Sequence, residues 1–199
     1  MKKPRTVTVS CLILAALAGL ATGCMSVHER QEAYHNISYF IEYLVRGDVR
    51  SAGTMLKQET DSGYAEAYRL FLPKRRSLDD EKHYFPVFLE NRIERFPRIR
   101  EYKRAGLIGE SANGTLSIVP SNPAAREEPM RSVLKKLIFR ENFDRQRVVR
   151  YIVENTRSIS KRELAAGFAF VRHKMALTGD MIQIAENDGA AEWREAERE

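Results

Sequence analysis

The sequence predicts a mainly α-helical fold with a minor β component, in which a helical N-terminal half is followed by a small β-hairpin and two or more helices. Apolar residues recur at helical spacing through most of the chain after residue 24. Only residues 107–119 have the pattern of two strands joined by a turn, at Asn113-Gly114. No repeat of about 34 residues recurs, so a solenoid of stacked helix pairs is not expected.

Residues 1–23 have the pattern of a cleavable bacterial signal peptide. Lys2, Lys3 and Arg5 precede an uncharged apolar stretch over residues 7–21, and small residues follow it. The stretch is shorter than the roughly 20 apolar residues that a membrane-spanning helix needs. We therefore expect a signal peptide here and not a transmembrane anchor.

The end of this segment resembles a bacterial lipobox that closes at Cys24. In that resemblance, Leu20, Ala21 and Gly23 are the recognition residues of the signal peptidase, although Ala21 stands where Leu is more usual. The Cys24 thiol would carry a diacylglycerol, and two acyl chains are enough for stable anchoring. The resemblance implies a palmitate-bearing, periplasm-facing lipoprotein, and Met25 in place of Asp favours the outer membrane over the inner one.

Removal of the signal peptide changes what the composition implies. The chain has 33 basic and 27 acidic residues, a net charge of +6, and three of the basic residues lie in the signal. Half of the positive excess is thus lost, which argues against a nucleic-acid partner. Of the two cysteines, Cys11 leaves with the signal and Cys24 is lipidated. The mature chain then has no thiol for a disulfide, a metal or catalysis.

Residues 24–96 are expected to form a helical N-terminal region. Ser26 and Glu29 have the spacing of a capping box, and an amphipathic helix then continues to a stop at Gly47. Further helices are expected at about residues 48–56, 64–72 and 86–96, with Pro97 ending or kinking the last of them.

Residues 97–184 are expected to contain the hairpin and two longer helices. Asn113-Gly114 accepts positive φ at both positions and favours a tight turn. A long helix is predicted over about residues 129–154, and Ser160 with Glu163 predicts the capped start of another. The charged residues 185–199 are predicted to be a flexible tail.

Residues 105–119, AGLIGESANGTLSIV, resemble the signature of the YdbL-like family of small periplasmic proteins, in which a Gly-(Val/Ile)-Gly-Glu run precedes an Asn-Gly turn. The later features keep the family's order over about residues 97–183. They are an Asn-x-x-Arg element at Asn142 and Arg145, a helix end near Asn155, a helix start at Ser160 and the segment 179–183. Thr115 and Ser117 replace the family's usual Tyr and Gly, and the helical N-terminal region is additional.

The resemblance implies an accessory factor without enzymatic activity. Family members are associated with an AsmA-like protein and a small lipoprotein in a lipid-conducting bridge across the envelope, where a chaperone-like role is proposed. By analogy this chain would bind an envelope protein through an exposed strand edge, with Gly109, Glu110, Asn113 and Gly114 as candidate partner-binding residues. Alternatively, the hairpin only caps the helical core and Glu110 is a solvated carboxylate. A lipid-carrying variant of the first function is also open.

An envelope hydrolase acting on peptidoglycan or lipid is the alternative function. Ser158 and Lys161 match the Ser-x-x-Lys motif of penicillin-recognising acyl transferases, but the companion Ser-Asp-Asn and Lys-Thr-Gly motifs are absent. Ser160 has a sufficient role as a helix cap. The histidines lack the spacing of metal ligands; they are His28, His35, His83 and His173. We predict a non-enzymatic protein without cofactor or metal, and no small-molecule ligand is identified.

Overall fold

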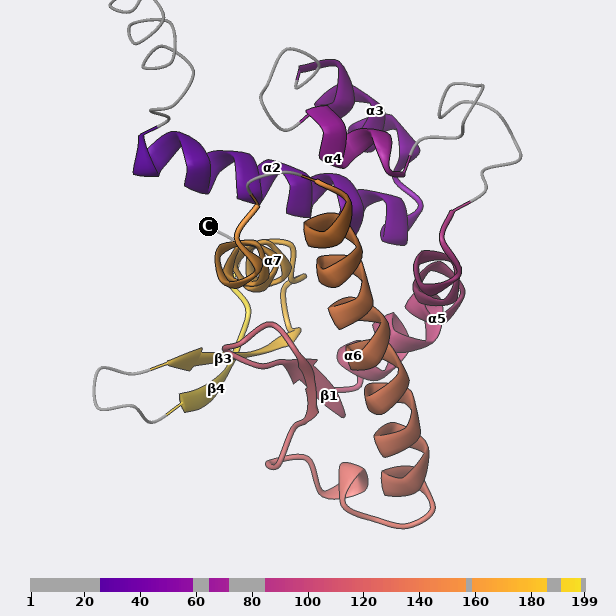
Figure 1. Cartoon of the computed structure of the whole chain (residues 1–199). Helices are drawn as coiled ribbons and strands as arrows, with labels where there is room; N and C mark the ends of the chain where they lie inside the picture. Colours follow the sequence, from indigo (N-terminus) through magenta and orange to yellow (C-terminus); the bar gives the residue numbers. More distant parts are fainter. Residues whose placement is uncertain (1–25, 59–64, 72–84, 157–158, 186–190, 198–199) are drawn as a thin grey trace, which may run out of the picture. The chain divides into compact units, whose positions relative to one another are not determined.

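The computed structural model describes residues 26–58, 65–71, 85–156, 159–185 and 191–197 (Figure 1). The elements are α2 (Val27–Arg46), α3 (Val49–Gln58), α4 (Ala65–Arg69), α5 (Val87–Arg104), β1 (Ile108–Glu110), β2 (Leu116–Ile118), the 3-10 helix η1 (Pro123–Ala125), α6 (Met130–Asn155), α7 (Lys161–Lys174), β3 (Met181–Ala185) and β4 (Ala191–Glu195). The prediction of a mainly α fold with a minor β part is confirmed. The predicted signal peptide and Cys24 lie outside the described residues.

The chain divides into two compact units, Met1–Glu32 and Ala33–Glu199. The described part of the first unit is the start of α2, where the predicted capping box is confirmed. The Ser26 backbone N–H donates to Glu29 Oε2 at 2.6 Å, and the Glu29 N–H donates to Ser26 Oγ at 3.2 Å. None of the described helices is both long and apolar enough to cross a membrane.

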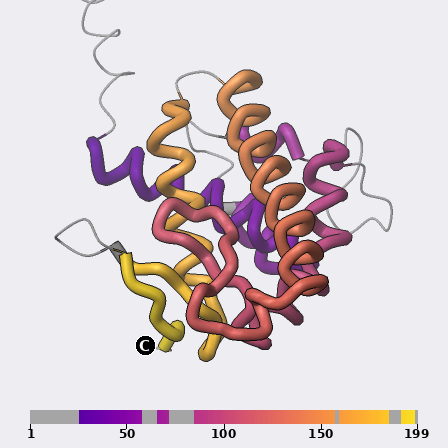
Figure 2. The backbone as a smooth tube through the Cα atoms, turned by 90° about the horizontal axis from the view of Figure 1, so that it is seen from below, coloured from indigo at the N-terminus to yellow at the C-terminus, as the bar shows by residue number. Residues whose placement is uncertain are grey.

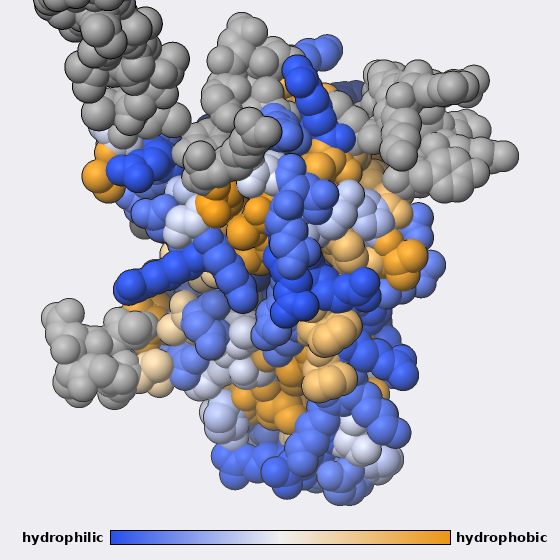
Figure 3. All heavy atoms as spheres, in the orientation of Figure 1, coloured by the Kyte–Doolittle hydropathy of each residue, from blue (hydrophilic) through white to orange (hydrophobic). Residues whose placement is uncertain are grey.

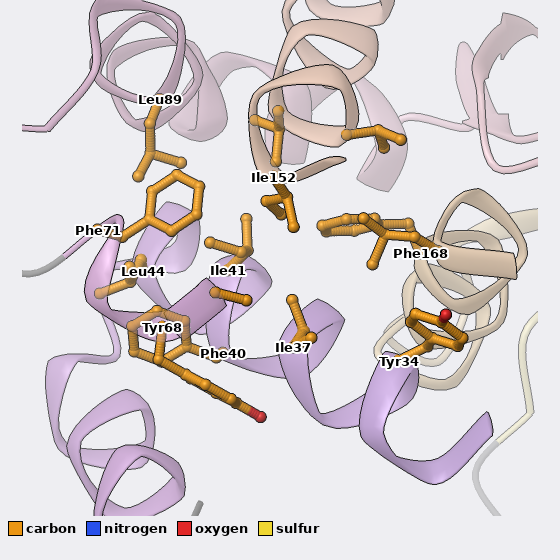
Figure 4. Packing of buried hydrophobic residues seen from close by; sticks show 14 of the residues in the cluster. Tyr34, Ile37, Phe40, Ile41, Leu44, Tyr68, Phe71, Leu89, Ile152 and Phe168 are labelled. Atoms are coloured by element: carbon orange, nitrogen blue, oxygen red, sulfur yellow. The ribbon is translucent and has the colours of Figure 1, made fainter. Parts of the chain in front are cut away.

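The larger of two hydrophobic clusters in the second unit lies where α2, from Ala33 onward, crosses the C-terminal end of α6 (Figure 1). Ile41 of α2, Leu89 of α5, Ile152 of α6 and Phe168 of α7 are members of this cluster (Figure 4). Each of the four is at most 1% exposed, so burial of their apolar surface supplies much of the driving force for folding. Residues of both predicted regions, 24–96 and 97–184, therefore share one core.

A second cluster connects α5 and α6 with the hairpin. Its buried members include Ile99, Ile108, Leu116 and Leu134. Helix α5 does not end at Pro97, as one alternative of the prediction had it, but continues to Arg104 and so includes Ile99. Helix α5 packs against α6 on both sides of Pro97, through Leu89 in the larger cluster and Ile99 in the second, and this packing compensates for the one backbone hydrogen bond that the proline removes.

The strands form one four-stranded sheet in the order β2-β1-β3-β4. The β1–β2 pair is the predicted hairpin and is antiparallel, β1–β3 is parallel, and β3–β4 is a second antiparallel pair. Strands β3 and β4 were not predicted. The prediction of a flexible tail is wrong for Ala191–Glu195, because this segment pairs with β3 along its whole length and Trp193 is half-buried.

Candidate functional site: a buried charge network beside a cationic cleft

The hairpin loop turns toward α6 and α7 (Figure 2). The Gly114 N–H donates to the Ser111 carbonyl at 2.8 Å, and the Ser111 N–H donates to the Thr115 carbonyl at 2.7 Å. Gly114 has φ +75°, which glycine adopts at no steric cost. Asn113 and Gly114 thus belong to a three-residue loop and not to the two-residue turn that the dipeptide predicted.

Three of the four candidate hairpin residues, Gly109, Glu110 and Gly114, are buried. Gly109 lies in the central strand β1, where a Cβ atom would be 2.3 Å from the Met181 carbonyl oxygen and 2.5 Å from the Trp193 ring. At Gly114 a Cβ atom would be 2.7 Å from the Cα of Ala169. Glu110 is 2% exposed, so the interpretation of Glu110 as a solvated carboxylate is wrong. Of the four candidate residues, Asn113 is the one that is exposed.

Glu110 is held by two cations. Arg145 donates from Nη1 to Glu110 Oε2 at 2.6 Å and from Nη2 to Oε1 at 3.0 Å, which makes a bidentate ion pair. Lys103 Nζ lies 2.7 Å from Oε1. Burial by itself would raise the pKa of Glu110, but the charges of Arg145 and Lys103 outweigh it and hold the pKa well below its usual value. Glu110 is therefore an ionised carboxylate in the protein interior.

The ion pairs continue from Arg145 through four helices. Arg145 Nε donates to Glu141 Oε1 at 2.9 Å, and Arg92 Nε donates to the same oxygen at 2.8 Å. The Nη2 atom of Arg92 donates to both oxygens of Glu42, at 3.0 and 3.1 Å, and Arg172 Nε donates to Glu42 Oε1 at 2.9 Å. The network thus connects the hairpin with α2, α5, α6 and α7.

The described network has one more cation than carboxylates. Arg95 adds the last links, donating from Nη2 to Asp144 at 2.6 Å and to Glu141 at 3.2 Å. The four carboxylates are Glu42, Glu110, Glu141 and Asp144; the five cations are Arg92, Arg95, Lys103, Arg145 and Arg172. Since charges in a low-dielectric interior interact strongly, this excess favours an additional anion nearby.

Sequence reasoning missed this network, although one signal was present. The apolar stripe of the long helix α6 passes through Leu134, Leu137, Val148 and Ile152, all buried. Glu141 and Arg145 lie at the same helical phase between these residues, so a stripe that continues across charges indicates that the charges are buried. The partners of these two charges on other elements lie 35 to 49 positions away and cannot be paired from sequence.

Asn142 closes the outer edge of β2. The Leu116 N–H donates to Asn142 Oδ1 at 2.8 Å, and Asn142 Nδ2 donates to the Leu116 carbonyl at 3.0 Å. The side-chain amide thus takes the place of a neighbouring strand. Because Asn142 bonds β2 at Leu116, and β1 lies between β2 and β3, the hairpin edge is covered at Leu116 and not open there.

A cleft of about 380 Å³ lies between the hairpin loop, α6 and α7. Its lining includes four cationic residues, Arg145, Arg150, Lys161 and Arg172, and three apolar ones, Val149, Ala165 and Phe168. No carboxylate, histidine, serine or cysteine is among the described residues that line it. The cleft is therefore cationic, and it lies directly beside the charge network.

Arg172 belongs to both the network and the cleft. It is 5% exposed, donates from Nη1 to the Gly114 carbonyl at 2.8 Å, and lies 5.0 Å from the centre of the Phe168 ring. Its Nη2 is buried and has no hydrogen-bond partner among the described residues. Burial and the charge of Arg145 lower the pKa of Arg172 to about 10, despite the attraction of Glu42.

Of the candidate Ser-x-x-Lys pair, only Lys161 lies within the described residues. Ser158 and His83 lie outside the described residues, and Lys161 is exposed. Ser160 has the predicted capping role, because its Oγ accepts from the Glu163 N–H at 3.4 Å. A ring nitrogen of His173 is 3.0 Å from the Ser111 carbonyl oxygen. Within the described ranges, no group of three His, Cys, Asp or Glu residues has the geometry of a metal site.

An exposed aromatic pair lies on α6, away from these buried groups. Phe139 is 72% exposed and Phe143 is 52% exposed, and their rings stack with centres 6.4 Å apart. Arg147 lies 5.8 Å from the centre of the Phe143 ring. On the face that Figure 3 shows, hydrophilic side chains predominate and apolar ones form small separate patches. Large exposed apolar side chains of this kind are typical of interaction surfaces.

Comparison of the chain with protein-family models, with curated proteins and with solved structures finds no match.

Proposed function

We propose that this protein is a lipid-anchored envelope protein and acts as a non-catalytic accessory factor, in an interaction or chaperone-like role. It would be held through Cys24 at the periplasmic face of the outer membrane. An AsmA-like lipid-transport complex is the partner that the resemblance to the YdbL-like family implies. The lipobox supports the anchoring, and the arrangement of the resembling segments supports the accessory role.

The observation that carries this proposal is that the segments of the resemblance meet in space. Glu110, from the Gly-Glu run, pairs with Arg145 of the Asn-x-x-Arg element. Asn142 of the same element binds β2. Gln183, from the third segment, lies in β3, and its Oε1 accepts from the Ala112 N–H at 3.4 Å. Segments that are far apart in the chain are thus in contact in the structure, as expected if they form one motif of the resemblance.

The cleft beside this unit supports binding in preference to hydrolysis. Hydrolysis by a serine or cysteine requires the nucleophile within hydrogen-bond reach of a base. The described residues that line the cleft provide cations, amides and one hydroxyl, that of Thr115, but no imidazole or carboxylate to act as a base. Such a set of side chains can hold an anionic group, and among the described lining residues only Lys161, of the Ser-x-x-Lys match, is a candidate to activate a nucleophile.

The aromatic pair Phe139 and Phe143 is the surface that we assign to the envelope partner. The two residues lie one turn apart on α6, so their rings form one exposed ridge. Burial of aromatic side chains at the centre of an interface supplies much of its binding energy. This assignment moves partner contact from the hairpin, which is mostly buried, to the exposed face of α6.

Site-specific crosslinking in native membranes tests the accessory role. A photo-reactive amino acid at position 139 should capture an envelope protein, whereas the same probe at the exposed Arg131 of the same helix should not. The proposal would be abandoned if the anchored protein captured no envelope protein at position 139 and deletion left the lipid composition of the envelope unchanged.

Labelling with palmitate tests the anchoring separately. The wild-type protein and a Cys11→Ala variant should both incorporate label, because Cys11 lies in the signal segment. A Cys24→Ala variant should incorporate none. Equal labelling of the Cys24→Ala variant would contradict anchoring at this residue.

A further inference from the structure

We propose that the cleft between the hairpin loop, α6 and α7 is a binding site for a phosphate-type anion, contacted by Arg172, Arg150 and Lys161. This inference goes beyond the accessory role and does not depend on the identity of a protein partner. A phosphate monoester could be presented by a soluble molecule or by a lipid headgroup, and the chemistry of recognition is the same for both.

The first observation is the unused donor of Arg172. Its Nε and Nη1 atoms are occupied by Glu42 and by the Gly114 carbonyl, but Nη2 is buried without a partner among the described residues. A buried guanidinium N–H without an acceptor costs free energy, because it has lost its hydration. Arg172 is one of the residues that line the cleft, so its guanidinium group lies beside the place where an anion would bind.

The second observation is the charge balance around Arg172. Glu42 accepts from both Arg92 and Arg172, so one carboxylate serves two guanidinium groups. The carboxylate of Glu110 is already shared by Arg145 and Lys103. The network therefore leaves Arg172 incompletely neutralised, which agrees with the direction in which burial and Arg145 shift its pKa.

The third observation is the set of side chains that surrounds the cleft. Arg150 and Lys161 line it from α6 and α7, both are exposed, and neither pairs with a carboxylate among the described residues. Gln146 adds an exposed amide. These groups can donate to several oxygens of one anion at the same time, and charge-assisted hydrogen bonds are the stronger ones.

The number of cations favours a doubly charged phosphate over a carboxylate. Arg150 and Lys161 are unpaired within the described ranges and Arg172 is only partly neutralised, so the site can balance two negative charges. A carboxylate offers two oxygens and one charge, whereas a phosphate monoester offers three terminal oxygens. Val149 and Phe168 form an apolar wall against which the organic part of an ester can pack, and the volume of about 380 Å³ accommodates such a group.

Calorimetric titration of the full chain in uncharged detergent tests this site. The probes are inorganic phosphate, dihexanoyl phosphatidic acid and, as a singly charged comparison, acetate. Phosphate should bind, and acetate should bind at least about tenfold more weakly. Phosphatidic acid binding about tenfold tighter than phosphate assigns the site to a lipid headgroup, and equal affinity assigns it to a soluble phosphate; either result supports the site.

Two matched charge variants localise the binding. Replacing Arg150→Gln and Lys161→Gln together should weaken phosphate binding about tenfold or more. Replacing Lys135→Gln and Lys136→Gln, two exposed residues of α6 outside the cleft, removes the same charge and should leave the affinity unchanged. Arg172→Lys keeps the positive charge beside Glu42 but removes the free Nη2 donor, so it should also weaken binding. The proposal is overturned if no phosphate probe binds, if acetate binds as well as phosphate, or if both double variants bind like the wild type.

Discussion

Glu110 of β1 and Arg145 of α6 form a buried ion pair with two hydrogen bonds, of 2.6 and 3.0 Å, across 35 positions of sequence. Arg145 also donates from Nη1 to the Gly114 carbonyl at 2.9 Å, so the same guanidinium holds both the strand and the loop of the hairpin. The pair therefore fixes the hairpin to the helical part of the second unit.

Removal of the Glu110 charge should destabilise the protein strongly. In a Glu110→Gln variant, Arg145 and Lys103 would remain buried without their shared carboxylate. Loss of one member of a buried pair typically costs about 3–5 kcal/mol in the free energy of unfolding. Denaturant unfolding followed by circular dichroism measures this cost. Glu101→Gln is the matched control, because Glu101 is exposed and its replacement should change stability by less than about 0.5 kcal/mol. Similar stabilities of the two variants would contradict a structural role for the pair.

Replacement of Asn142 by leucine should open the edge of β2. The N–H and C=O groups of Leu116 would lose both of their side-chain partners, at a cost of about 1–3 kcal/mol. We expect faster amide hydrogen exchange at Leu116 together with the lower stability. Gln146→Leu, one turn further along α6 at an exposed position, should leave exchange at Leu116 unchanged. Unchanged exchange in Asn142→Leu would mean that the amide does not protect the strand.

Alanine at Gly114 should be more disruptive than alanine at Gly179. Both glycines have positive φ, +75° and +87°, so both substitutions introduce backbone strain of about 1–2 kcal/mol. Only at Gly114 would the new Cβ meet other atoms, 2.7 Å from Ala169, whereas Gly179 has open space. The free energies of unfolding of the two variants, measured by thermal unfolding, should therefore differ by about 1–3 kcal/mol, the usual cost of overpacking. Equal losses of stability in the two variants would show that the hairpin loop moves freely away from α7.

Acid should unfold the protein through its buried carboxylates. Burial by itself would raise the pKa values of Glu42 and Glu141, but the neighbouring guanidinium groups, with Arg92 the strongest, lower both to about 2. The ordinary value is 4.5, so the stabilisation is complete above about pH 4.5 and is lost as the pH falls toward 2. In this range each carboxylate contributes a slope of about 1.4 kcal/mol per pH unit.

The acid transition can be assigned to these groups by substitution. The free energy of unfolding, measured with urea between pH 5 and pH 2, should fall less steeply in a Glu141→Gln variant, because one titrating carboxylate is missing. Glu101→Gln again serves as the control and should keep the slope of the wild type. A Glu141→Gln slope equal to that of the wild type would contradict the assignment.

The helices and the β1–β2 hairpin followed from local signals, and the β3–β4 pair did not. The long helix was predicted over about residues 129–154 and is α6, Met130–Asn155, and the predicted caps at Ser26 and Ser160 are present. These features depend on neighbouring residues, which sequence displays directly. Strand β4, Ala191–Glu195, is short, charged and mostly exposed, and it forms because β3 lies beside it. Strand propensity depends on such partners, so β4 could not be recognised alone.

The helical class and the position of the hairpin could be predicted from periodicity and turn residues alone, and the resemblance to the YdbL-like family stays a prediction. The sequence also identified Cys24 as the expected lipid attachment site. The burial of Glu110, the bonding of Asn142 to the edge of β2 at Leu116 and the unused donor of Arg172 became visible only in the folded chain. The reason is physical: capping and periodicity act over a few residues, whereas burial and ion pairing depend on distances between groups up to 130 positions apart.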